Sequence, residues 1–209
     1  MTMRRLFFEH DTINYFHELE ELAEGCNDNV ALFPMFIGYD FTEEDCLNAE
    51  MLWFKGECLD GIGLAKQQYN TEMLKSREKI EMLSFIPIKT RIVITSLNMI
   101  LFHTTLIEEI TLQGLSKGLI TVPVSLEIVE KGISSDWFCI TSETDLGIPA
   151  KKKRFIKGFD RTNWNGEDFC ISSHYDPPFL YVSQGVYRFL NSLPDDKKGT
   201  LDCEPVELI

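Results

Sequence analysis

The run Pro178-Phe-Leu-Tyr-Val-Ser183-Gln-Gly-Val-Tyr-Arg-Phe-Leu190 predicts a strand that leads directly into a helix. Its first part, Phe179–Val182, is apolar and aromatic, as is typical of a strand buried in a sheet. Ser183 follows, and a serine hydroxyl at this place accepts a hydrogen bond from one of the first N–H groups of the helix, which have no partner inside it. The sequence therefore predicts a strand, a serine N-cap and a helix as one unit.

The residues after the cap predict the apolar face of the helix, the end of the helix and a last strand. Apolar residues recur at helical spacing and give the helix one apolar face: Val186, Phe189, Leu190 and Leu193. Pro194 ends the helix because its ring fits poorly in a helix interior. Gly199 then precedes a last short strand, predicted over Leu201–Leu208.

A similar order of elements is predicted earlier in the chain. Ile86–Ile94 is β-branched and alternating, which indicates a strand, and Thr95 after it is placed to begin a helix. Either this echo reflects two related strand–helix–strand halves, 1–131 and 132–209, or it arises by chance and the chain forms one continuous domain. Both alternatives predict an α+β fold with mixed or antiparallel sheets and a few packed helices.

The charge and the apolar pattern of the chain argue against several classes of protein. With 209 residues and a formal net charge of −13, the chain lacks the basic surface that attracts nucleic-acid phosphates. No apolar run approaches the roughly 20 residues that cross a bilayer. The first ten residues contain too short an apolar stretch for a secretory signal. We therefore expect a cytoplasmic protein that binds neither nucleic acid nor membrane.

The cysteines and histidines show no pattern of a metal or cofactor site. The six cysteines are dispersed along the chain, with no Cys-x-x-Cys pair: Cys26, Cys46, Cys58, Cys139, Cys170 and Cys203. Reduced and mostly buried thiols are the expected state of such residues in a chain of this size. No phosphate-binding loop and no His-Glu-x-x-His pair occur. We expect no metal and no cofactor.

A hydrolase is one alternative that the residues leave open. Ser183 stands between a strand and a helix, where a hydrolase nucleophile would stand, and His174 is a candidate base. However, Tyr181 occupies the position of the first glycine of the nucleophile elbow, and only Gly185 fits that motif. Capping is therefore the preferred role of Ser183, and we expect no catalytic residue.

An acidic segment is the candidate binding site. Thr42 is placed to cap a short helix whose first turn is acidic, and acidic residues there suit the positive end of the helix dipole. The alternatives are a capped helix and nothing more, or an acidic contact patch. The patch would consist of Asp40, Glu43, Glu44 and Asp45.

The C-terminal part of the chain resembles that of bacterial immunity proteins. The resemblance rests on Trp164-Asn-Gly-Glu-Asp168-Phe169, then Leu180-Tyr-Val-Ser183, an amphipathic helix, Gly199 and a closing strand. Immunity proteins accompany polymorphic toxins and the effectors of contact-dependent or type VI secretion. The motif residues look structural, so the resemblance carries over no catalytic residue.

This resemblance implies an antitoxin that binds a cognate toxin and covers its active site. The acidic balance fits, because many nuclease-type toxins are basic, and carboxylates would then steer association. The acidic segment is the expected contact. The competing hypotheses are the hydrolase and a non-enzymatic adaptor, and self-association into a homo-oligomer stays open.

Overall fold

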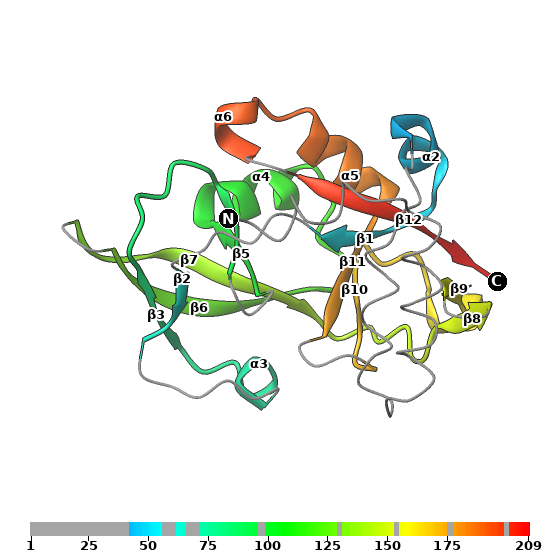
Figure 1. Ribbon diagram of the computed structural model, residues 1–209, viewed down its shortest axis with the longest axis horizontal. Coiled ribbons are helices and arrows are strands. Elements are labelled where there is room, and N and C mark those ends of the chain that lie inside the picture. Colours follow the sequence, from blue (N-terminus) through cyan, green and yellow to red (C-terminus); the bar gives the residue numbers. More distant parts are fainter. Residues whose placement is uncertain are drawn as a thin grey trace, which may run out of the picture. The chain divides into compact units, whose positions relative to one another are not determined.

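The computed structural model describes residues 42–55, 62–65, 72–95, 99–128, 131–152, 155–174, 178–198 and 201–209 (Figure 1). Contacts within the chain join Asp40–Lys152 and Ile156–Ile209 into one compact unit. The described residues form two six-stranded sheets with packed helices, so the predicted α+β class is confirmed. No helix in these ranges is long and apolar enough to cross a membrane.

The first sheet has the strand order β10-β11-β1-β12-β9-β8. Its strands are β1 (Met51–Lys55), β8 (Ala150–Lys152), β9 (Phe155–Phe159), β10 (Phe169–Ser172), β11 (Phe179–Ser183) and β12 (Asp202–Leu208). The central strand β1 runs antiparallel to both β11 and β12, and β9 runs parallel to the end of β12. Segments from both ends of the described sequence therefore share this sheet.

The second sheet has the strand order β2-β3-β6-β7-β5-β4. Its strands are β2 (Ile62–Leu64), β3 (Ile80–Ser84), β4 (Ile92–Ile94), β5 (Ile100–His103), β6 (Leu119–Ile128) and β7 (Gly132–Ser142). The long hairpin of β6 and β7 forms its centre, with β3 parallel to β6 on one side and β5 antiparallel to β7 on the other.

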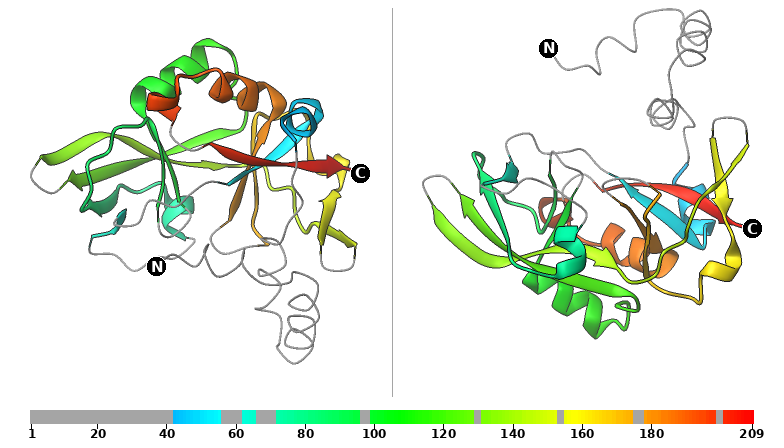
Figure 2. Two further views of the ribbon diagram at one scale, coloured as in Figure 1. Left: turned by 45° about the horizontal axis from the view of Figure 1, so that its top comes forward. Right: turned by 90° about the horizontal axis from the view of Figure 1, so that it is seen from below.

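The helices of the described residues are short, and the two longest of them pack near each other. They are α2 (Glu43–Asn48), α3 (Glu72–Ser76), α4 (Thr104–Leu112), α5 (Gln184–Asn191) and α6 (Asp195–Lys198). In two views α4 and α5 lie on the same side of the strands, whereas α3 lies on the other side (Figures 1 and 2). The apolar faces of α4 and α5 therefore cover one common core.

That core joins the two sheets. Its buried residues come from both sheets and from α2, α4 and α5, and include Leu52, Phe54, Ile100, Phe102, Leu106, Ile110, Phe169, Val182, Val186 and Leu190. Phe102 on β5 of the second sheet lies between two rings of the first. Its ring centroid is 6.1 Å from that of Phe54 and 6.5 Å from that of Phe169. The two sheets thus share one hydrophobic core.

A second core covers the opposite face of the second sheet. It contains Ile62, Leu74, Ile80, Met82, Val93, Met99, Leu101, Val122, Val124, Leu126, Trp137 and Cys139. On β5 the successive residues Ile100, Leu101 and Phe102 contribute alternately to the two cores. A strand packed on both faces reads as a continuous apolar run, and this strand shows that pattern.

The strand, cap and helix predicted around Ser183 are confirmed. β11 ends at Ser183, α5 begins at Gln184, and the Ser183 hydroxyl accepts a hydrogen bond of 3.3 Å from the N–H of Val186. The closing strand β12 also matches its prediction. Gly199, which lies between α5 and β12 in the sequence, is outside the described residues.

The predicted helix start at Thr95 is wrong. The N–H of Thr95 donates to the carbonyl of Met99, and the chain enters strand β5 before the helix α4 begins at Thr104. His103 caps α4 through its side chain. A strand buried on both faces has no alternation to distinguish it from a helix, which explains the error. The strand predicted over Ile86–Ile94 is also shorter, because β4 begins at Ile92.

The position proposed as a boundary between halves lies at a hairpin turn. Lys131 stands between β6 and β7, whose residues pair from Leu119 and Ser142 to Ile128 and Gly132. In addition, β1 from the first half pairs with β11 and β12 from the second. Position 131 therefore separates neither the two sheets nor the two cores.

Candidate partner-binding surface

Reciprocal hydrogen bonds cap the N-terminus of the acidic helix α2. The backbone N–H of Thr42 donates to the carboxylate of Asp45 at 2.8 Å, and the N–H of Asp45 donates to the Thr42 hydroxyl at 3.2 Å. This reciprocal pair is a capping box, which satisfies two backbone donors at once. The hydroxyl and the backbone N–H of Thr42 hold the pKa of Asp45 below its ordinary value. The carboxylate of Asp45 is therefore already bound within the cap of its own helix.

Contacts with α5 hold α2 in place. Cys46 on α2 is buried in the first core, and its thiol donates to the carbonyl of Cys203 on β12 at 3.4 Å. The side chains of Gln184 and Arg188 on α5 both donate to the carbonyl of Leu47. These contacts hold α2 against α5 and β12, and the acidic residues of α2 stay exposed at the surface.

The structure brings three of the four predicted contact residues together. Glu43, Glu44 and Asp45 are all exposed on α2, and Asn191 donates to the Glu43 carboxylate at 3.3 Å. Asp40 lies outside the described residues. Because Asp45 is committed to the cap, Glu43 and Glu44 are the carboxylates best placed to contact a partner.

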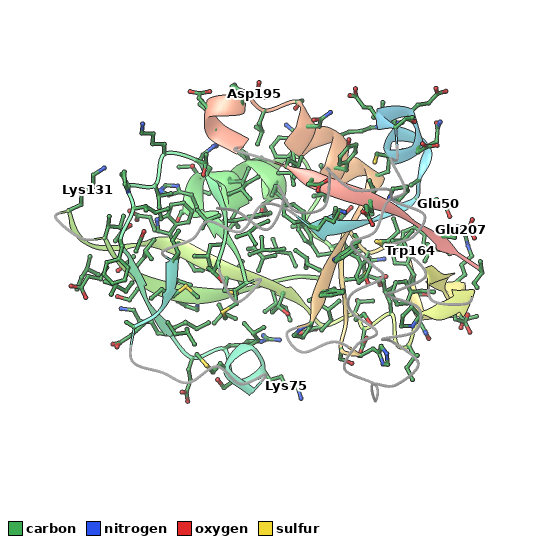
Figure 3. All side chains as sticks on the ribbon, in the orientation of Figure 1. Glu50, Lys75, Lys131, Trp164, Asp195 and Glu207 are labelled. Carbon is green, nitrogen blue, oxygen red and sulfur yellow. The ribbon has the colours of Figure 1, made fainter. Side chains whose placement is uncertain are left out.

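A neighbouring carboxylate that sequence reasoning missed does not extend this patch. Glu50 and Arg161 are exposed and form two hydrogen bonds, of 2.7 and 2.8 Å. The guanidinium lowers the pKa of Glu50 and also lies 5.9 Å from the ring centre of Trp164. Glu50 and Trp164 appear at the same end of the view as α2 (Figure 3). The charge of Glu50 is therefore compensated locally.

The two candidate hydrolase residues are not brought together. β10 and β11 pair antiparallel, with Ser172 opposite Phe179 and Phe169 opposite Val182. His174 follows Ser172 at one end of this pair, and Ser183 stands at the other. Four strand residues at roughly 3.3 Å each place the two ends about 13 Å apart. The pair therefore has no geometry for proton transfer between them.

The hydroxyl of Ser183 is used within the fold. It donates to a carboxylate oxygen of Asp168 at 2.8 Å while it accepts from the N–H of Val186. The other carboxylate oxygen of Asp168 accepts from the backbone N–H of Lys117 at 3.1 Å. Ser183 and Asp168 thereby connect the start of α5 to the loop between α4 and β6.

The remaining residues of the Trp164–Phe169 run also have structural roles. The indole N–H of Trp164 donates to the carbonyl of Glu167 at 2.9 Å, and the N–H of Asn165 donates to the Glu167 carboxylate at 2.7 Å. Gly166 has a φ of +76°, which favours glycine. These contacts form a tight turn before β10, as expected of structural motif residues.

The described cysteines are free and buried thiols, as predicted. These are Cys46, Cys139, Cys170 and Cys203, whereas Cys26 and Cys58 lie outside the described residues. Burial raises the pKa of Cys139 and of Cys170 to about 12, so both thiols are protonated at neutral pH. Within the described ranges no three His, Cys, Asp or Glu residues gather as metal ligands.

The geometry thus defines a two-sheet α+β protein with an exposed, rigidly capped acidic helix. Comparison with protein-family models finds no match for the chain, and comparison with curated proteins finds none either.

Proposed function

We propose that this protein is a cytoplasmic immunity protein that binds a cognate secreted toxin and neutralises it by covering its active site. The toxin would be an effector of a polymorphic-toxin or type VI secretion system and would carry a basic surface. The observation that carries the proposal is the acidic helix α2, which is exposed and held rigidly by its capping box and by α5. The resemblance of the C-terminal segment to immunity proteins supports the same function.

Charge and rigidity together favour this function. A net charge of −13 attracts a basic protein over a distance and accelerates its association. A preformed helix also loses little conformational freedom when the partner binds, so more of the contact energy appears as affinity. Glu43 and Glu44 combine both properties.

Reversing the charge of α2 should slow association with the toxin. The variant Glu43→Lys/Glu44→Lys leaves the Thr42–Asp45 capping box intact and changes the local charge by four units. We take the polypeptide encoded immediately upstream as the expected toxin. We expect the association rate of the variant with this polypeptide, purified in a catalytically inactive form, to fall about tenfold at low salt. At roughly 0.5 M salt the difference should largely disappear, because screening shortens the range of these charges. Stopped-flow fluorescence measures both rates.

A matched charge reversal elsewhere provides the control. The variant Glu78→Lys/Glu143→Lys changes the net charge equally, at exposed residues outside α2. The ion pair between Glu143 and Arg77 is exposed and contributes little stability. Equal association rates for the two variants at low salt would show that α2 has no special role.

A further inference from the structure

The helix α4 begins with an uncommon N-cap residue. His103 has an extended backbone (φ −73°, ψ 146°), and its ring nitrogen Nδ1 accepts a hydrogen bond of 3.3 Å from the N–H of Thr105. Serine, threonine, aspartate and asparagine are the usual caps, and each offers an oxygen that is an acceptor at neutral pH. A histidine nitrogen is an acceptor only while it carries no proton. The cap of α4 therefore depends on the protonation of one side chain.

The contacts of Nδ1 show which form of the ring the cap requires. A neutral imidazole carries its proton on one nitrogen only, so Nδ1 accepts when the proton is on Nε2. Nδ1 also lies 3.1 Å from the hydroxyl of Thr105, which can either donate or accept. The backbone N–H of Thr105 can only donate. That N–H therefore requires the neutral ring with Nδ1 unprotonated.

The fold holds the imidazole at the start of α4. His103 is the last residue of β5 and pairs with Trp137 on β7, and the centroids of their two rings lie 5.2 Å apart. The backbone N–H of His103 donates to the carbonyl of Arg91 at 3.0 Å. The hydroxyl of Thr104 donates to the carbonyl of Asp136, also at 3.0 Å. These contacts fix the junction of β5 and α4 on both sides.

The elements packed against His103 contribute charges of both signs. Their charged residues are Arg91 before β4, Asp136 on β7, and Glu108 and Glu109 on α4. Arg91 and Glu109 bind each other at 2.7 Å, and the carboxylate of Asp136 accepts from the hydroxyl of Ser134 at 3.3 Å. Among the described residues, no carboxylate is hydrogen-bonded to the His103 ring. No direct ion pair there favours the protonated form.

Protonation of the ring removes the cap. The N–H of Thr105 then faces a second N–H group, and a positive charge lies at the positive end of the helix dipole. A charged imidazole gains some attraction to the indole of Trp137, but this gain does not replace the lost acceptor. Leu106 and Ile110 of α4 are both 0% exposed in the core that the two sheets share. Loosening the first turn of α4 therefore weakens its packing on that core.

We propose that His103 is a pH-sensitive cap, which holds the start of α4 while its ring is neutral and releases it when the ring is protonated. Histidine is the side chain whose ordinary change of charge falls between about pH 5 and pH 8. The stability that the cap contributes is thus present at about pH 8 and is lost as the pH falls. This inference does not depend on the proposed function.

The variant His103→Asn tests the cap, because asparagine is a strong N-cap residue whose side chain does not titrate. Every other titrating group is common to both chains, so the ratio of their folding equilibrium constants isolates the charge of His103. From about pH 8 to about pH 5, we expect the folding equilibrium constant of the wild type to fall about fivefold relative to that of His103→Asn, as the loss of one cap predicts. Urea titrations at both pH values give the constants.

His174→Asn provides the matched control. His174 is exposed and belongs to no described helix or strand, so this variant should keep the pH dependence of the wild type. A ratio for His103→Asn that stays constant across this pH range, or an equal change for both variants, would overturn the inference. Nitrogen-15 NMR of the wild type needs no variant: we expect Nδ1 of His103 to be unprotonated at about pH 8, and a proton on Nδ1 there would also overturn it.

Discussion

Phe102→Ala should lower the free energy of unfolding by about 3–5 kcal/mol, the usual cost of truncating a fully buried phenylalanine. Phe102 is 0% exposed and contacts aromatic rings of the other sheet. The change leaves a cavity at the junction of both sheets. Because small proteins are stable by only about 5–15 kcal/mol in total, the variant should lose a large fraction of its stability.

Urea titration followed by tryptophan fluorescence measures this effect. Trp53 reports on the first sheet and Trp137 on the second, so single-tryptophan variants show whether the sheets unfold together. We expect coincident transitions, both shifted by Phe102→Ala. Phe85→Ala is the matched control, and it should change stability by no more than about 0.5 kcal/mol because Phe85 is exposed. Two separate transitions, with only one shifted, would contradict a shared core.

Ser183→Ala should destabilise the protein by about 2 kcal/mol. The variant loses the N-cap of α5, which typically contributes about 1 kcal/mol, and removes the hydroxyl that donates to Asp168. The part-buried Asp168 carboxylate then keeps its hydrogen bond from the backbone N–H of Lys117, but losing a hydrogen bond to a charged group adds a similar cost. Thermal unfolding, analysed with the measured enthalpy, gives the difference.

Two further serine substitutions make this result interpretable. Ser183→Thr retains a hydroxyl that caps a helix almost as well, so it should recover most of the lost stability. Ser135→Ala removes an exposed hydroxyl from β7 and should have almost no effect. If Ser183→Ala were as stable as the wild type, the hydrogen bonds of Ser183 would contribute nothing, and its role as a cap would be wrong.

Local chemistry made the unit around Ser183 predictable from the sequence. A serine between an apolar run and an amphipathic run has one favourable place, because the first N–H groups of a helix need an acceptor. The same reasoning located the cap at Thr42. In both cases the partners lie within three residues of the capping residue, so no distant contact was needed to predict them.

Distant contacts explain what the sequence did not reveal. The run after Thr95 looked amphipathic, but Ile100, Leu101 and Phe102 are buried from both sides because two cores meet at β5. The interleaving of β1 with β11 and β12 depends on long-range pairing, which local patterns do not encode.

The candidate surface shows the same division between local and distant information. The exposed acidic turn of α2 followed from the sequence, because acidic residues after a capping threonine favour a helix start. Two facts could be learned only from the structure. Asp45 is committed to the capping box, and Glu50 is paired with Arg161. Because Asp40 lies outside the described residues and Asp45 is bound in the cap, Glu43 and Glu44 remain of the four predicted residues.

The central claim is that the protein neutralises a toxin by occupying it and not by chemical turnover. Titrating the protein into a fixed concentration of the active upstream polypeptide, well above the dissociation constant, tests this claim most directly. We predict that toxin activity falls linearly and reaches zero at one equivalent, and that Ser183→Ala behaves identically wherever it is folded. Complete loss of toxin activity at a small fraction of an equivalent, abolished by Ser183→Ala, would contradict the account.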